Sequence, residues 1–213
     1  MKVLVTGFDP FGGESINPAF EVIKKLPNKI ENIQIFKLEV PTVFQKAINV
    51  TTGKIKEIEP DVIINIGQAG GRYSITPERI AININDASIS DNESNQPKNI
   101  PIDNNGPAAY FSTLPIRGIV KEINNIGVPA SISNTAGTYV CNNLMYGVLN
   151  YIHKNNLDIR AGFIHIPFLH EQVVNKRNIA SFSIETLLEG IKAAIIACDK
   201  YKLDIDDISG EIC

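Results

Sequence analysis

The sequence predicts a single α/β domain built as a three-layer sandwich, with a mostly parallel twisted sheet covered by helices on both faces. Apolar, β-rich runs alternate with amphipathic helical segments along most of the chain. Several of these runs are apolar throughout, which is typical of strands buried on both faces of a parallel sheet. The length of 213 residues suits one domain spanning 1–213, and we expect the acidic end, about 202–213, to be a loose tail.

The first third of the chain contains the beginning of the predicted sheet. Its elements are a strand at 2–8, a helix at 19–26, a strand at 34–40, a helix at about 42–59 and a strand at 61–67. The first strand breaks at a run of turn formers, Asp-Pro-Phe-Gly-Gly. Asn17 and Pro18 predict the start of the first helix, because Asn is a favourable N-cap and Pro suits the first helical position.

The rest of the chain continues the alternation after a polar excursion. Residues 79–88 alternate apolar and polar side chains, as a half-exposed strand does, and residues 90–107 are typical of a loop. The later elements are a helix at about 115–125, a strand at 128–133, a helix at 141–154, a strand at 161–167 and a helix at 183–200. This order of strands and helices favours a parallel sheet.

Composition and charge exclude several classes of function. Hydrophobic residues make up 44% of the chain and charged residues 20%, so a core of normal size is available. A balance of 20 Lys and Arg against 23 Asp and Glu argues against nucleic acid as a partner, because phosphate binding needs a basic surface. We expect neither a membrane span nor a signal peptide. Three widely spaced cysteines fit free thiols in a reducing cytoplasm.

Three polar elements lie where predicted strands end, which is where ligands bind in open α/β sheets. A Gly-rich loop after Gly67 leads to Glu78, Cys141 lies at the start of a helix, and His165 lies near the end of a strand. A carboxylate, a nucleophile and a base therefore meet at one edge of the sheet. Taken alone, Glu78 is equally explained as a surface charge paired with Arg79.

Cys141 is the most informative of these residues. It follows a Gly turn and lies within one turn of a helix start, where unpaired N–H groups and the helix dipole favour the thiolate and lower the thiol pKa. The same N–H groups can receive an oxyanion during acyl transfer. The alternative is a small buried hydrophobe, which is the better explanation for Cys198 on its apolar helical face.

Three histidines compete for the role of base. His153 ends a helix, where its charge suits the helix C-terminus, and His170 lies in a predicted loop. His165 is flanked by apolar residues, so it is also explained as a core histidine. The spacing of His165 and His170 matches no zinc pattern, and we predict no metal site.

The two Gly-rich stretches, GFDPFGG and GQAGG, match neither the dinucleotide-binding fingerprint nor the P-loop. Glycine allows the backbone to approach a small ligand closely. We therefore expect a small-molecule pocket in which Phe8 and Phe11 form apolar walls.

Four segments of the chain resemble the cysteine-type pyroglutamyl peptidases, also called pyrrolidone-carboxylate peptidases. They are VTGFDPFGG, GQAGGRYSITPERIAIN, VPASISNTAGTYVCNNLMY and GFIHIPFLHEQ. The resemblance implies a cysteine exopeptidase with an open α/β sandwich fold, which hydrolyses the amide bond after an N-terminal L-pyroglutamyl residue of peptides. It also implies that the enzyme uses no metal or organic cofactor and assembles as a homotetramer.

The resemblance assigns roles to residues by position. It implies that Cys141 is the nucleophile, that His165 rather than His170 is the general base and acid, and that Glu78 is the carboxylate that orients the imidazole. For the pocket that encloses the lactam ring, it implies Phe8, Phe11, Asn17, Gln68 and Tyr139, with Gln68 acting through its backbone.

One segment departs from the usual sequence of the family. Relatives usually read DARIPDN where this chain reads DASISDN, so Ser88 replaces an arginine that is thought to assist charge stabilisation. Either Arg72 or Arg79 substitutes for it, or activity is reduced. Two alternatives stay open: an amidase that uses the same three residues on another acyl group, and a non-catalytic α/β ligand-binding protein.

Overall fold

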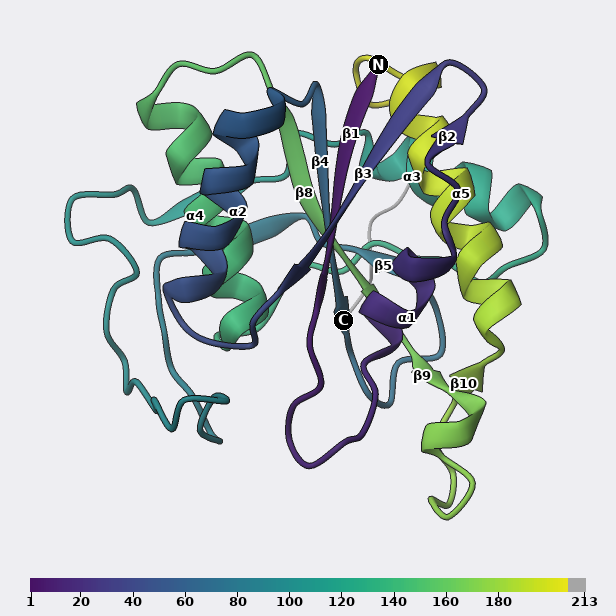
Figure 1. The fold of residues 1–213 in the computed structure, drawn as a ribbon, viewed down its shortest axis with the longest axis horizontal. Helices are drawn as coiled ribbons and strands as arrows, with labels where there is room; N and C mark the ends of the chain where they lie inside the picture. The colour runs from purple at the N-terminus through teal and green to yellow at the C-terminus, as the bar shows by residue number, and fades with distance from the viewer. Residues whose placement is uncertain (207–213) are drawn as a thin grey trace.

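A six-stranded sheet with the strand order β2-β3-β1-β4-β8-β5 runs through the centre of the computed structural model, which describes residues 1–206 (Figure 1). Its strands are β1 (Lys2–Phe8), β2 (Lys29–Ile30), β3 (Ile33–Val40), β4 (Val62–Gln68), β5 (Thr76–Pro77) and β8 (Arg160–Ile166). Strands β3, β1, β4 and β8 are parallel, and the short edge strands β2 and β5 are antiparallel to their neighbours. The predicted mostly parallel sheet is confirmed.

Helices cover both faces of this sheet (Figure 1). They are α1 (Pro18–Lys25), α3 (Ile116–Asn125) and α5 (Ile184–Lys200) on one face, and α2 (Lys46–Ile58) and α4 (Val140–Lys154) on the other. Alternation along β1 explains the two cores: Val3 and Val5 pack with α1, α3 and α5, whereas Leu4 and Phe8 pack with α2 and α4. The predicted three-layer sandwich is therefore confirmed.

Local signals at the helix ends agree with the prediction. Asn17 caps α1 by accepting a hydrogen bond from the backbone N–H of Ala19, and Pro18 is the first helical residue. Helix α4 starts at Val140, so Cys141 lies in its first turn. The start of α1 is set by residues next to each other in the chain, which is why the sequence predicts it.

The structure corrects two predicted strands. Residues 128–133 form only isolated parallel bridges, Ala130 with Ile75 and Ser133 with Glu78. Pro77, which lies between the two bridged positions, has no N–H to extend them into a ladder. The strand predicted at 79–88 is regular only over β6 (Ile80–Ile82), which pairs with β7 (Ala109–Phe111).

The second predicted helix begins later than expected. Residues 42–45 are not helical, and α2 starts at Lys46. The N–H of Phe44 donates to Asp91 Oδ2 at 2.9 Å, and the N–H of Gln45 donates to Asn143 Oδ1 at 3.2 Å. These bonds to distant side chains hold the segment outside the helix.

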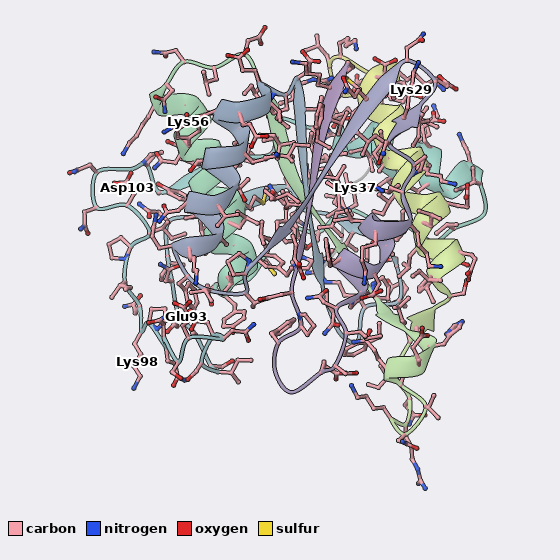
Figure 2. All side chains as sticks on the ribbon, in the orientation of Figure 1. Lys29, Lys37, Lys56, Glu93, Lys98 and Asp103 are labelled. Carbon is pink, nitrogen blue, oxygen red and sulfur yellow. The ribbon has the colours of Figure 1, made fainter. Side chains whose placement is uncertain are left out.

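The polar excursion between β6 and β7 contains no regular strand or helix between residues 90 and 107, as predicted. The side chains of Glu93, Lys98 and Asp103 mark its course in Figure 2. Asp103 accepts hydrogen bonds from Lys154 and, at 2.7 Å, from Asn150 Nδ2 of α4. The bond from Lys154 is the largest cause that lowers the pKa of Asp103 to about 2. The excursion is therefore held against α4, the helix that carries Cys141 in its first turn.

Near the end of the described residues, Asp204 contacts the start of α3. Its carboxylate accepts hydrogen bonds from the backbone N–H groups of Arg117 (3.0 Å) and Gly118 (3.1 Å), at the start of α3. Of the tail expected at 202–213, residues 207–213 lie outside the described part of the chain. Within residues 1–206, no helix is both long and apolar enough to cross a membrane.

Candidate active site

The carboxyl ends of β4 and β8 lie side by side at one edge of the sheet. In their parallel register Gly67 pairs with His165, and Thr76 of β5 pairs with His165 on its other side. Paired residues on neighbouring strands point to the same face of a sheet. A glycine therefore lies next to the imidazole on the face that α2 and α4 cover.

His165 and Glu78 form a buried pair. His165 Nδ1 lies 2.6 Å from Glu78 Oε1, and the two residues are 5% and 0% exposed. Glu78 directly follows β5, and its backbone N–H donates to the carbonyl of Phe163 at 2.9 Å. The edge strand thus places the carboxylate beside the ring nitrogen, and the structure brings together the carboxylate and base expected from the sequence.

The thiol of Cys141 lies over the glycine beside this pair. A Cβ atom on Gly67 would be 3.1 Å from Cys141 Sγ and 2.7 Å from Cζ of Phe163. The missing side chain of Gly67 therefore provides the space that the thiol occupies next to His165. The sequence predicts close backbone approach to a ligand for the GQAGG stretch that begins at Gly67, but not that this glycine makes room for the thiol.

Burial has a larger effect on the pKa of the Cys141 thiol than the start of α4 has. Burial raises the pKa of Cys141 to about 12, and the charge of Glu78 also raises it. The charge of Arg72 and the backbone N–H of Cys141 lower this pKa, but by less. The predicted lowering of this pKa is wrong, because the thiolate loses more hydration than the first turn of α4 restores.

The imidazole is also neutral at rest. Burial lowers the pKa of His165, and the hydrogen bond and charge of Glu78 oppose this effect, whereas the charge of Arg72 adds to it. With a neutral thiol beside a neutral imidazole, the thiolate forms when His165 takes the proton. The arrangement can perform covalent acyl transfer, in which a base activates the nucleophile and a carboxylate orients the base.

Of the two arginines considered for the site, only Arg72 lies in it. Its Nη1 is 2.6 Å from Glu78 Oε1. Arg79 instead donates from Nε to Asn134 Oδ1 at 2.7 Å. Ser88 is exposed. On either side of it, the carbonyl of Asp86 accepts a hydrogen bond from the hydroxyl of Thr138, and the carbonyl of Ser90 accepts one from the hydroxyl of Tyr139.

Aromatic side chains cluster around Tyr139, two residues before Cys141. The ring of Tyr139 lies 6.2 Å from that of Phe11 and 5.3 Å from that of Phe44, which the sequence analysis missed. Phe8 is 2% exposed and packs on Phe163, with ring centroids 6.3 Å apart. Phe11 and Tyr139 therefore belong to one cluster, and Phe8 lies in the core.

The other two predicted pocket residues lie at the start of α1 and at the end of β4. Asn17 uses its amide within its own loop, donating to the carbonyl of Asp9 at 3.0 Å and capping α1. Gln68 Oε1 accepts a hydrogen bond of 2.9 Å from Nε2 of Gln172. Gln172, a buried residue that the sequence analysis missed, also accepts from the N–H of Leu169. It joins the loop after β8 to the end of β4.

Two buried asparagines fix the helix start that carries Cys141. Asn142 accepts from the N–H of Ile82 and donates to its carbonyl, both at 2.9 Å. Asn143 accepts from the N–H of Gln45. Two consecutive asparagines in the otherwise apolar first half of a helix are the sequence signal that could have identified them.

His153, His170 and Cys198 lie apart from this site. His153 packs on Tyr110 with ring centroids 5.6 Å apart, and His170 Nδ1 lies 2.9 Å from Ser181 Oγ. Cys198 is fully buried in α5, and Cys213 lies outside the described residues. Over residues 1–206, His, Cys, Asp and Glu side chains form no group of three or more that could hold a metal ion.

The charge state of the thiol predicts how its reactivity depends on pH. Because the pKa of Cys141 is raised, the thiolate fraction, and with it the rate of alkylation by iodoacetamide, should keep rising above pH 9. Peptide mass spectrometry over pH 6–10 measures this rate separately for Cys141, Cys198 and Cys213. A plateau for Cys141 below pH 8 would instead reveal a preformed thiolate.

Comparison with known proteins identifies the family. The family model described as pyroglutamyl peptidase matches residues 1–201. The pyrrolidone-carboxylate peptidase of Clostridium perfringens is 56% identical over 213 residues, which is all of both chains. Pyrrolidone-carboxylate peptidase 2 of Caldanaerobacter subterraneus is 59% identical over 195 residues, covering 92% of this chain and 95% of its own. The crystal structure of pyroglutamyl peptidase I from Bacillus amyloliquefaciens has a TM-score of 0.94 and 48% identity, covering 97% of this chain and 98% of that one. This chain is therefore a member of the pyroglutamyl peptidase family.

Proposed function

We propose that this protein is a cysteine exopeptidase that hydrolyses the amide bond after an N-terminal L-pyroglutamyl residue of peptides. The observation that carries the proposal is the contact of 2.6 Å between His165 and Glu78, with the Cys141 thiol beside them over Gly67. Membership of the pyroglutamyl peptidase family indicates that the acyl group of the substrate is pyroglutamyl. The reaction needs no metal or organic cofactor, since the thiol, imidazole and carboxylate supply nucleophile, proton transfer and orientation.

The proposed mechanism begins with proton transfer within the site. Because His165 Nδ1 is engaged by Glu78, Nε2 is the nitrogen that accepts the proton of Cys141. The thiolate attacks the carbonyl carbon of the scissile amide and forms a tetrahedral oxyanion. Collapse breaks the C–N bond as His165 protonates the leaving amine, and a thioester remains. Water, deprotonated by His165, then hydrolyses the thioester and restores the thiol.

The start of α4 supplies the oxyanion site in this mechanism. An α-helix leaves its first N–H groups without intrahelical acceptors, and in α4 these include the N–H groups of Val140 and Cys141. The same helix end carries the nucleophile, so an oxygen on the attacked carbon lies close to these donors. Removal of one oxyanion donor typically costs roughly 3–4 kcal/mol of barrier.

The proposed pocket selects an uncharged N-terminus. Phe11 and Tyr139 offer apolar walls, with Phe8 behind them and the backbone of Gln68 as the polar contact to the lactam. Asn17 contributes by holding the loop that carries Phe11, because its amide is committed to Asp9 and Ala19. A peptide with a free ammonium group would bury that charge without a partner, which is costly. We therefore expect glutaminyl amides to be poor substrates.

We also propose that the protein works in the cytoplasm as a homotetramer. A reducing compartment keeps the nucleophilic thiol of Cys141 free. The assembly is supported by resemblance to the family and by Ile100, an apolar side chain of the polar excursion that is 48% exposed. Size-exclusion chromatography with light scattering should give a mass of four chains, and a monomer would refute the assembly.

Release of a chromogenic amine from its L-pyroglutamyl amide tests the reaction. Cys141→Ala should abolish turnover, His165→Ala should leave almost none, and Glu78→Gln should cost less than either, because it keeps an acceptor for His165 Nδ1. Cys198→Ala, which removes a thiol buried in α5, is the matched control and should stay active.

A comparison of substrates distinguishes a pyroglutamyl peptidase from the two alternative functions, a broader amidase and a binding protein. Cleavage of glutaminyl or other aminoacyl amides at a rate equal to that of the pyroglutamyl amide would favour an amidase of broader range. Absence of turnover in the wild type would favour a binding protein, unless Ser88→Arg restores activity. Turnover by Cys141→Ala close to that of the wild type would refute the nucleophile.

Gly67→Ala tests the space beside His165. A methyl group 3.1 Å from Cys141 Sγ and 2.7 Å from Phe163 must displace the thiol or the ring. A shift of about 1 Å at a reacting group can cost about 100-fold in rate, so we expect a loss of kcat of that order. Gly53→Ala is the control, because a Cβ there meets nothing within 4 Å. Wild-type kcat in Gly67→Ala would show that the thiol does not need this space.

A further inference from the structure

Arg72 connects three parts of the active site. It lies in the loop between β4 and β5, and its Nη1 donates to Glu78 Oε1 at 2.6 Å and to the hydroxyl of Thr76. Its Nη2 lies 3.4 Å from the carbonyl of Thr135, on the loop that leads to Cys141. The guanidinium therefore contacts the carboxylate of Glu78, the edge strand β5 and the loop that leads to Cys141.

Arg72 and His165 share a single oxygen atom of Glu78. Each lies 2.6 Å from Oε1, whereas Oε2 is buried without a hydrogen-bond partner. A fully buried carboxylate is costly unless a cation compensates its charge. His165 is neutral at rest, so it does not supply that cation. Within the described contacts of Glu78, Arg72 is the group that does.

We infer that Arg72 is a positioning residue of this site: it compensates the buried charge of Glu78 and holds Oε1 against His165 Nδ1. The inference rests on the proposed function, in which His165 must present Nε2 to the thiol of Cys141. Arg72 touches none of the reacting atoms, so its effect passes through Glu78 and His165.

The charges around His165 predict the pH dependence of this effect. The titratable and charged groups that face it are Glu78 after β5, Arg72 in the β4–β5 loop and Cys141 of α4. The charge of Arg72 lowers the pKa of His165 and that of Cys141. Loss of this charge therefore raises both pKa values. Because His165 must be neutral to accept the proton of the thiol, the acid limb of the activity profile should move to higher pH.

Arg72→Met and Arg79→Met form a matched pair for the test. Both remove a guanidinium from the same stretch of chain, but Arg79 contacts Asn134 and not Glu78. With the pyroglutamyl amide, Arg72→Met should lower kcat about 10 to 100-fold with little change in KM, as when a hydrogen bond to a buried charge is removed. Its acid limb should move up by about one pH unit. Arg79→Met should keep the wild-type profile.

Arg72→Lys separates charge from geometry. Lysine keeps the positive charge but lacks the planar fork that reaches Glu78, Thr76 and Thr135 together. The acid limb should therefore return toward its wild-type position while kcat recovers only in part. If Arg72→Met unfolds, as circular dichroism would show, this variant carries the test.

Alkylation of Cys141 by iodoacetamide distinguishes failure of this inference from failure of the proposed function. At a fixed pH, Arg72→Met should slow alkylation, because loss of the positive charge raises the pKa of the thiol, whatever the substrate is. A wild type that does not cleave pyroglutamyl amides, together with slowed alkylation, would refute the substrate but support the role of Arg72. A wild-type pH profile, kcat and alkylation rate in folded Arg72→Met would overturn the inference.

Discussion

The parallel pairing of β4 with β8 is the constraint on which this site depends. It puts Gly67 beside His165 on the sheet face that carries α4. Only a residue without a side chain leaves room there for the Cys141 thiol, whose sulfur lies within 3.1 Å of the Cβ position. The short strand β5 then adds the carboxylate from the other side of β8. The thiol, the imidazole and the carboxylate therefore owe their proximity to the register of three strands.

The same burial that brings these groups together determines their charges. The site holds one compensated ion pair, Arg72 with Glu78, next to an imidazole and a thiol that are both neutral at rest. A neutral pair is less costly to bury than a thiolate and an imidazolium. In the proposed mechanism the charges develop only during the reaction, and the N–H groups at the start of α4 and the carboxylate of Glu78 stabilise them.

The parts of the fold that could be predicted are those with local causes. Asn17 and Pro18 specify a helix start from two adjacent positions, and the apolar runs at β1, β4 and β8 reflect strands buried on both faces. The errors arose where a residue distant in the chain determines which backbone groups can pair. Phe44 and Gln45 lie outside α2 because Asp91 and Asn143 accept their N–H groups, and residues 128–133 are limited to isolated bridges opposite Pro77.

The order of residues along the chain was enough to predict the fold class and to reveal the family resemblance, and that resemblance assigned Glu78, Cys141 and His165 to the candidate triad. The folded structure was needed to show that Arg72 is the arginine that contacts Glu78 and that Gly67 leaves room for the Cys141 thiol. It was also needed to show that the thiol is protonated at rest. These properties depend on desolvation and on distances between segments far apart in the chain, such as Arg72 and Thr135. A sequence shows which residues are present, but the pKa of a side chain shifts only when folding removes that side chain from water.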